Sequence, residues 1–188
     1  MDPEHNTPSP MNETRHPTVL QILPSLNGGG VERGTVEMAS ALKERGWTPI
    51  VASSGGLMTH ELKRIGVRHL ILPAGSKNPW VMRRNITRLA GLIREYDVDI
   101  IHARSRAPAW SAYYAAKRTG VHFVTTFHAA YNRGGFLKNT YNAIMTKGER
   151  VIAISDFIAD HILSNYDVAP EKIITIPRGV DCRKFNPA

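Results

Sequence analysis

Residues 18–47, TVLQILPSLNGGGVERGTVEMASALKERGW, decide the fold prediction because they hold a strand, a glycine loop and a helix in succession. The apolar run at 18–24 predicts a short buried strand, and residues 31–45 predict a helix that stops at Gly46. Three consecutive glycines at 28–30 join them, although glycine loses the most backbone freedom on folding. Either a ligand such as a phosphate, a sugar or a dinucleotide comes very close to this backbone, or the loop merely needs positive φ angles.

The same alternation of strand and helix continues along the chain. Strands that are apolar along their whole length are buried on both faces, which is typical of a parallel sheet. Helices between such strands predict an α/β, doubly wound, mostly parallel Rossmann-like sheet with helices on both faces. The predicted strands are 18–24, 48–54, 67–74, 99–104, 122–129, 150–155 and 172–179, and the predicted helices are 31–45, 58–66, 79–96, 107–120, 137–148 and 156–166.

Length and composition predict one folded domain in 188 residues. Residues 1–17 hold four prolines and few aliphatic side chains, so we expect a disordered tail, followed by a domain over 18–180 and the start of a linker at 181–188. No apolar run approaches the roughly 20 residues of a membrane span. Residues 1–17 also lack the apolar core of a secretory signal, and Cys182 is the only cysteine, which predicts a reducing, cytoplasmic setting.

The net charge is +8, and basic residues concentrate between Lys77 and Arg118, where acidic residues are few. Such a surface attracts phosphates or an anionic membrane, and the alternative is an ordinary solvated helix face. Nucleic acid is not an expected partner, because aromatic residues are not interleaved with the basic ones and no recognised module motif occurs.

Ligands of doubly wound sheets bind outside the carboxyl ends of the strands, so residues that leave strand ends are the candidates for a site. His102 and His128 fall near the ends of consecutive strands and are expected to face one cleft. A neutral imidazole can hydrogen-bond a sugar hydroxyl, and a protonated one can stabilise phosphate charge. His128 is the stronger candidate because a glycine-containing loop follows it, whereas His102 fits a packed core position equally well.

Two other kinds of chemistry find weaker support. Gly28, Gly30 and Gly34 approach the spacing of a nicotinamide-dinucleotide fingerprint. However, residues 24–27 make the loop too long for the tight turn, and the next strand ends in serine and glycine instead of an acidic residue. The eight histidines show no metal-ligand spacing, so no metal and no cofactor is predicted. A glycine loop before a helix N-terminus favours an anionic group.

Five segments in order complete a family pattern: LNGGGVERGTVEMASALKERGW (26–47), DVDIIHARS (97–105), TTFHAAY (125–131), RVIAISDFIADHIL (150–163) and ITIPRGVDCRKFNP (174–187). The chain resembles the N-terminal domain of the retaining, GT-B-fold glycosyltransferases of family 4, also called group 1. Arg104 stands where many members have a second histidine, Ala129 where aspartate is common, and Arg178 where asparagine is frequent, which puts the acceptor in doubt more than the reaction.

The resemblance implies a role for each candidate residue. His128 is expected to be catalytic and to contact the transferred sugar. The glycine loop would lie beside the donor phosphates and the acceptor, and further residues would bind the acceptor or line the cleft. The loop residues are Gly28, Gly29, Gly30 and Glu32; the acceptor-binding residues are His102, Arg104, Ser105, Arg106 and Tyr131; and the other cleft residues are Ser155 and Arg178.

The resemblance also implies a reaction and its partners. A nucleotide-sugar would serve as donor substrate, without metal, and the sugar would pass with retention to a glycan or lipid-linked acceptor in lipopolysaccharide or surface polysaccharide biosynthesis. We expect a cytoplasmic protein, peripheral on the inner face of the cell membrane. The C-terminal donor-binding domain of the family is absent, so the chain alone is expected to be inactive. A non-catalytic glycan-, membrane- or partner-binding module and a dinucleotide-dependent enzyme are the alternatives.

Overall fold

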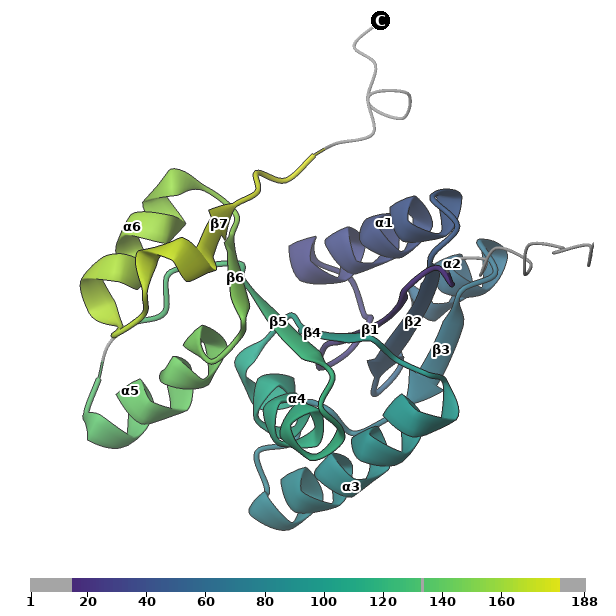
Figure 1. The fold of residues 1–188 in the computed structure, drawn as a ribbon, viewed down its shortest axis with the longest axis horizontal. Helices are drawn as coiled ribbons and strands as arrows, with labels where there is room; N and C mark the ends of the chain where they lie inside the picture. The colour runs from purple at the N-terminus through teal and green to yellow at the C-terminus, as the bar shows by residue number, and fades with distance from the viewer. Residues whose placement is uncertain (1–14, 133, 180–188) are drawn as a thin grey trace, which may run out of the picture.

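The computed structural model describes residues 15–132 and 134–179. In this part of the chain seven parallel strands form one sheet in the order β3-β2-β1-β4-β5-β6-β7, which confirms the predicted fold (Figure 1). Most of the predicted tail and the whole 181–188 segment lie outside the described residues. The strands are β1 (Thr18–Ile22), β2 (Thr48–Ser53), β3 (Arg68–Ile71), β4 (Ile100–Ala103), β5 (His122–Phe127), β6 (Arg150–Ala153) and β7 (Ile173–Thr175).

Helices cover both faces of the sheet, as Figure 1 shows for α1 on one side and α3 and α4 on the other. The larger apolar cluster lies beneath α3, α4 and α6 and includes Leu20, Ile101 and Phe127. A smaller cluster, with Val36 and Val51, lies beneath α1 and α2. The helices are α1 (Gly30–Glu44), α2 (Thr59–Arg64), α3 (Pro79–Glu95), α4 (Arg106–Thr119), α5 (Phe136–Ala143) and α6 (Asp156–Asn165). None of the described helices is long and apolar enough to cross a membrane.

Local sequence signals set where the helices begin and end. The Asn78 side chain accepts a hydrogen bond from the backbone N–H of Trp80 at 2.9 Å, and Pro79 occupies the first helical position of α3. Gly46 and Gly120 follow α1 and α4 with φ of 80° and 79°, a left-handed conformation that favours glycine.

All seven predicted strands are shorter in the structure, the last one most of all, and one predicted helix is divided. The predicted helix at 137–148 is the helix α5 followed by a 3-10 turn, η1 (Ile144–Thr146). The last strand, predicted to reach residue 179, ends at Thr175. Pro177 lies just beyond it and has no backbone N–H to continue the ladder.

The strand order reverses beside β1, because β2 lies on one side of it and β4 on the other. Ile22 pairs in register with Ala103, and the backbone N–H of Arg104 still donates to the carbonyl of Ile22 at 3.0 Å. The pairing of β1 with β4 ends here, beside the point where the strand order reverses, which is where doubly wound sheets bind ligands.

Candidate functional site

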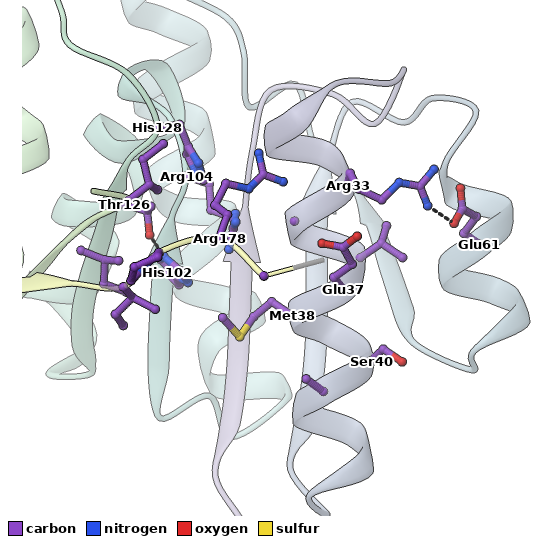
Figure 2. A pocket seen from close by; sticks show the side chains of 18 of the residues that line it. Arg33, Glu37, Met38, Ser40, Glu61, His102, Arg104, Thr126, His128 and Arg178 are labelled. Carbon is purple, nitrogen blue, oxygen red and sulfur yellow. Dashed lines mark hydrogen bonds and ion pairs between the residues drawn. The ribbon is translucent and has the colours of Figure 1, made fainter. Parts of the chain in front are cut away.

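A pocket of about 530 Å³ opens between α1 and the strands β4, β5 and β6. His102, Arg104, Thr126 and His128 line its strand side, and Arg178, which follows β7, crosses toward α1 (Figure 2). These strand residues share one face because side chains alternate across a sheet. We call this space the first pocket.

His102 lies at the bottom of the first pocket and is 6 % exposed. Its Nε2 hydrogen-bonds with Thr126 Oγ1 at 2.7 Å, which joins β4 to β5. Burial lowers the pKa of His102 well below its ordinary value, and the charge of Arg104 lowers it further. The imidazole is therefore neutral at physiological pH. Its contacts are those of a packed core histidine, which was one of the two interpretations of His102 from the sequence.

His128 comes directly after β5 and has a different environment. Both of its ring nitrogens are buried and lack a hydrogen-bond partner among the described residues. Burial lowers the pKa of His128 to about 3, and the neighbouring charges of Arg104 and Arg178 contribute. His128 is thus a neutral imidazole with one donor and one acceptor available, which suits contact with sugar hydroxyls.

Arg104 is a buried cation, with only 6 % of its surface exposed. Its Nη1 donates to the neutral Gln21 Oε1 at 3.1 Å, and its Nε has no partner among the described residues. The pKa of Arg104 is lowered to about 10, mainly by burial and also by the charge of Arg178, whereas Glu37 opposes the shift. A buried charge without an ionic partner is unfavourable, so an anion that enters this pocket gains both attraction and a free N–H donor.

Two glycines of α1 leave room for these guanidinium groups. A Cβ atom on Gly30 would lie 2.6 Å from Arg178 Nη1. On Gly34 it would lie 3.1 Å from Arg178 Nη2 and 3.2 Å from Arg104 Nη2. The nearest groups to these two positions are thus the ends of arginine side chains and not the sheet.

The other loop glycines have separate reasons. Gly28 has φ of 138°, which other residues rarely adopt, so the loop does need a positive φ angle there. A Cβ atom on Gly29 would meet the Glu32 carboxylate at 2.7 Å. Gly29 is the N-cap of α1 and no side chain caps the helix, which leaves N–H groups of its first turn available to an anion. The loop itself does not line the first pocket, although Gly34 does.

The structure divides the predicted acceptor-binding residues between two pockets. His102 and Arg104 line the first, whereas Ser105 and Arg106 line a second pocket of about 420 Å³ at the start of α4. Tyr131 lies beside the second, since the guanidinium of Arg106 stacks 4.3 Å from its ring centre. Burial raises the pKa of Tyr131 to about 12, so its hydroxyl stays protonated.

Ser155 lines neither pocket and instead caps α6, where its hydroxyl accepts from the backbone N–H of Ile158 at 3.3 Å. Sequence reasoning missed Gln21 and Glu37 as contributors to the first pocket, whereas Thr126 is one of the residues at strand ends where a site was expected. Gln21 carried a usable signal, because it is a fully buried polar residue within an otherwise apolar strand.

Comparisons with known proteins agree with this geometry. The sequence profile of Glycosyltransferase Family 4 matches residues 28–184. A search of curated proteins found no match. Among solved structures, a glycosyltransferase from Rickettsia africae is 47 % identical, with a TM-score of 0.81 over 91 % of this chain and 45 % of that one.

Two further solved structures share the fold at low identity. HepE from Anabaena, in complex with UDP and glucose, is 14 % identical with a TM-score of 0.71, covering 89 % of this chain and 46 % of that one. The lipopolysaccharide outer core galactosyltransferase WaaB is 15 % identical with a TM-score of 0.67, covering 87 % and 46 %.

The chain spans about half the length of these structures. Its parallel sheet corresponds to one Rossmann-like half of a GT-B fold, and the profile covers most of the described residues. The chain belongs to Glycosyltransferase Family 4.

Proposed function

We propose that this chain is the acceptor-side half of a glycosyltransferase that moves a sugar from a nucleotide-sugar donor to a glycan or lipid-linked acceptor with retention. The single observation that carries the proposal is that Arg104 Nε and both ring nitrogens of His128 are buried in one pocket and have no hydrogen-bond partner in the described part of the chain. A diphosphate-linked sugar offers both an anion for the first and hydroxyl groups for the second. In a two-domain protein a second domain would supply most of the donor contacts.

Transfer of a sugar from a nucleotide develops negative charge on the departing diphosphate. Arg104 and Arg178 would face that charge from one side of the pocket. Fixed donors aimed at developing charge are a large source of rate acceleration. In this proposal these cations neutralise the leaving group, so no metal ion is required.

His128 would act on the sugar and not on the phosphate. Its low pKa keeps it neutral, so it neither repels an oxocarbenium-like transition state nor neutralises the diphosphate. A neutral imidazole can orient the transferred sugar through its hydroxyl groups, which supports the catalytic role proposed for His128. His102 would hold Thr126 and the floor of the pocket in place.

The pathway and location belong to the same proposal. Assembly of lipopolysaccharide or another surface polysaccharide agrees with the activity named for WaaB. The exposed Arg83, Arg84 and Arg88 of α3 form a cationic face that suits an anionic membrane, so we place the protein in the cytoplasm and peripherally on the inner membrane face.

A transfer assay tests the proposal. The protein would be a two-domain polypeptide with residues 1–188 at its N-terminus, incubated with radiolabelled nucleotide-sugars and a membrane lipid extract, with EDTA in a parallel sample. We expect label in the lipid or polysaccharide fraction, unaffected by EDTA, and a loss of about 100-fold or more in His128→Ala. His122→Ala, at the other end of the same strand, is the matched control. Equal turnover in both variants would exclude the catalytic role of His128.

A further inference from the structure

The second pocket lies between the starts of α3, α4 and α5, outside the first. Lys77, Arg106 and Lys138 contribute three cationic side chains to its lining, and no acidic residue lines it. Ser105 and Tyr141 add two hydroxyl groups. Within the described residues neither lysine has a carboxylate within ion-pair distance.

Arg106 is the fixed member of this set. Its Nη1 donates to Asn142 Oδ1 at 2.7 Å, and its guanidinium stacks on Tyr131, which itself packs 5.0 Å from Phe127 in the apolar core. One cation is therefore held in place while Lys77 and Lys138 remain exposed and able to adjust. A rigid cation with two flexible ones and hydroxyl donors matches the oxygens of a phosphate group.

Large apolar side chains stand exposed next to these lysines in the chain. Phe136 and Leu137 precede Lys138 and are each 83 % exposed, and Trp80 follows Lys77 by three residues and is 80 % exposed. Phe136 and Leu137 are adjacent in the chain at the start of α5, and Trp80 lies at the start of α3. Aromatic and aliphatic groups beside lysines fit the boundary between lipid headgroups and hydrocarbon.

The two pockets meet at one point of the chain. Arg104 lines the first and Arg106 lines the second, and two residues of extended chain span at most about 7 Å. This limit applies to the backbone, and the two side chains enter different pockets, so an acceptor would have to extend past the end of β4 to reach both.

We propose that the second pocket binds the phosphate of a phosphorylated glycolipid acceptor. In that arrangement the sugar of the acceptor reaches the first pocket and its hydrocarbon lies against Trp80, Phe136 and Leu137. The identification of this ligand as the acceptor rests on the proposed function. The proposal that the second pocket binds a lipid phosphate is independent of that function.

Binding to vesicles tests the proposal on the 188-residue chain. The probes are phosphatidylcholine vesicles that contain a polyprenyl phosphate, the same vesicles with phosphatidylglycerol instead, and soluble glucose 1-phosphate. The double variant Lys77→Gln/Lys138→Gln removes two charges from the pocket. Lys117→Gln/Arg118→Gln removes the same charge from the exposed last turn of α4 and is the matched control.

We expect the pocket variant to bind polyprenyl phosphate at least about tenfold more weakly, because each lost charge-assisted hydrogen bond is worth on the order of tenfold in affinity. The control should change binding less than about twofold, since Lys117 and Arg118 do not line the second pocket. Equal losses in both variants, or equal binding to phosphatidylglycerol, would show general attraction to anionic membranes and overturn the pocket assignment.

Phe136→Ser/Leu137→Ser separates the lipid from a soluble phosphate. It should weaken binding to the polyprenyl phosphate vesicles and leave binding of glucose 1-phosphate unchanged. Unchanged vesicle binding would overturn the lipid part of the proposal. No sugar transfer is measured in these vesicle experiments. Failure of the His128→Ala assay would therefore leave the evidence for lipid phosphate binding intact, and would remove only the identification of this lipid as the acceptor.

Discussion

Acid should destabilise this chain through the same histidine that we place in the transfer site. The pKa of His128 is about 3 in the folded protein, whereas an unfolded histidine titrates near pH 6.5. The unfolded state therefore binds more protons between these values, so the free energy of unfolding falls as the pH drops below about 6.5. At pH 5 this contribution amounts to about 2 kcal/mol relative to pH 8, from about 1.5 pH units at about 1.36 kcal/mol each.

Urea unfolding of the wild type and of His128→Asn at pH 8 and pH 5 measures this contribution. Asparagine keeps a polar side chain but does not titrate. The free energy of unfolding of the variant should therefore fall by about 2 kcal/mol less than that of the wild type between pH 8 and pH 5. The pKa of the buried His102 is also lowered. His102 should therefore contribute to the loss of stability in acid in the wild type and in His128→Asn alike. His122→Asn controls for loss of a histidine from β5. An equal acid loss in the wild type and His128→Asn would refute the electrostatic account of the pocket.

The remaining predictions concern glycines and a helix cap. Gly56→Ala should lower the free energy of unfolding by about 3 kcal/mol or more, because its φ is 142° and its Cβ would lie 2.4 Å from the carbonyl carbon of Leu26. Gly91→Ala in α3 meets nothing within 4 Å and should instead stabilise by about 0.5–1 kcal/mol, which urea unfolding would distinguish. Gly34→Ala should weaken pyrophosphate binding about two- to threefold in calorimetry, because its Cβ would lie 3.1 Å from Arg178 Nη2 and 3.2 Å from Arg104 Nη2 and both guanidinium groups would have to shift slightly; wild-type affinity would contradict the role given to this glycine. Ser155→Ala should lower stability by about 1 kcal/mol through loss of the α6 cap and leave pyrophosphate binding unchanged.

The fold was predictable because its signals are local and repeated. Buried strands alternate with amphipathic helices, and caps such as Asn78 and stops such as Gly46 mark the helix ends. The ends of elements were less predictable. The 3-10 turn at Ile144–Thr146 depends on packing of its three side chains into the core, which no periodicity in the sequence records.

From the sequence, only those residues of the candidate site that lie at the carboxyl ends of predicted strands could be identified. His128 and Arg104 leave neighbouring strands, so the sequence placed them together. Ser105 and Arg106 line a different pocket from Arg104. This difference depends on the direction of each side chain beyond the end of β4, where the alternation of a strand no longer predicts it. The close approach of Arg178 to Gly30 and Gly34 joins residues more than 140 positions apart, and no local pattern contains that contact.

The central claim is that the first pocket is built to receive an anion at Arg104. The most direct measurement is the NMR resonance of the Arg104 Nε–H in the 15N-labelled chain during titration with pyrophosphate and with UDP-glucose, assigned by its loss in Arg104→Lys. We predict that this resonance shifts and that its exchange with solvent slows as ligand binds, while the exposed Arg118 shows no such change. A resonance of Arg104 that stays unchanged at saturating concentrations of both ligands would contradict the account.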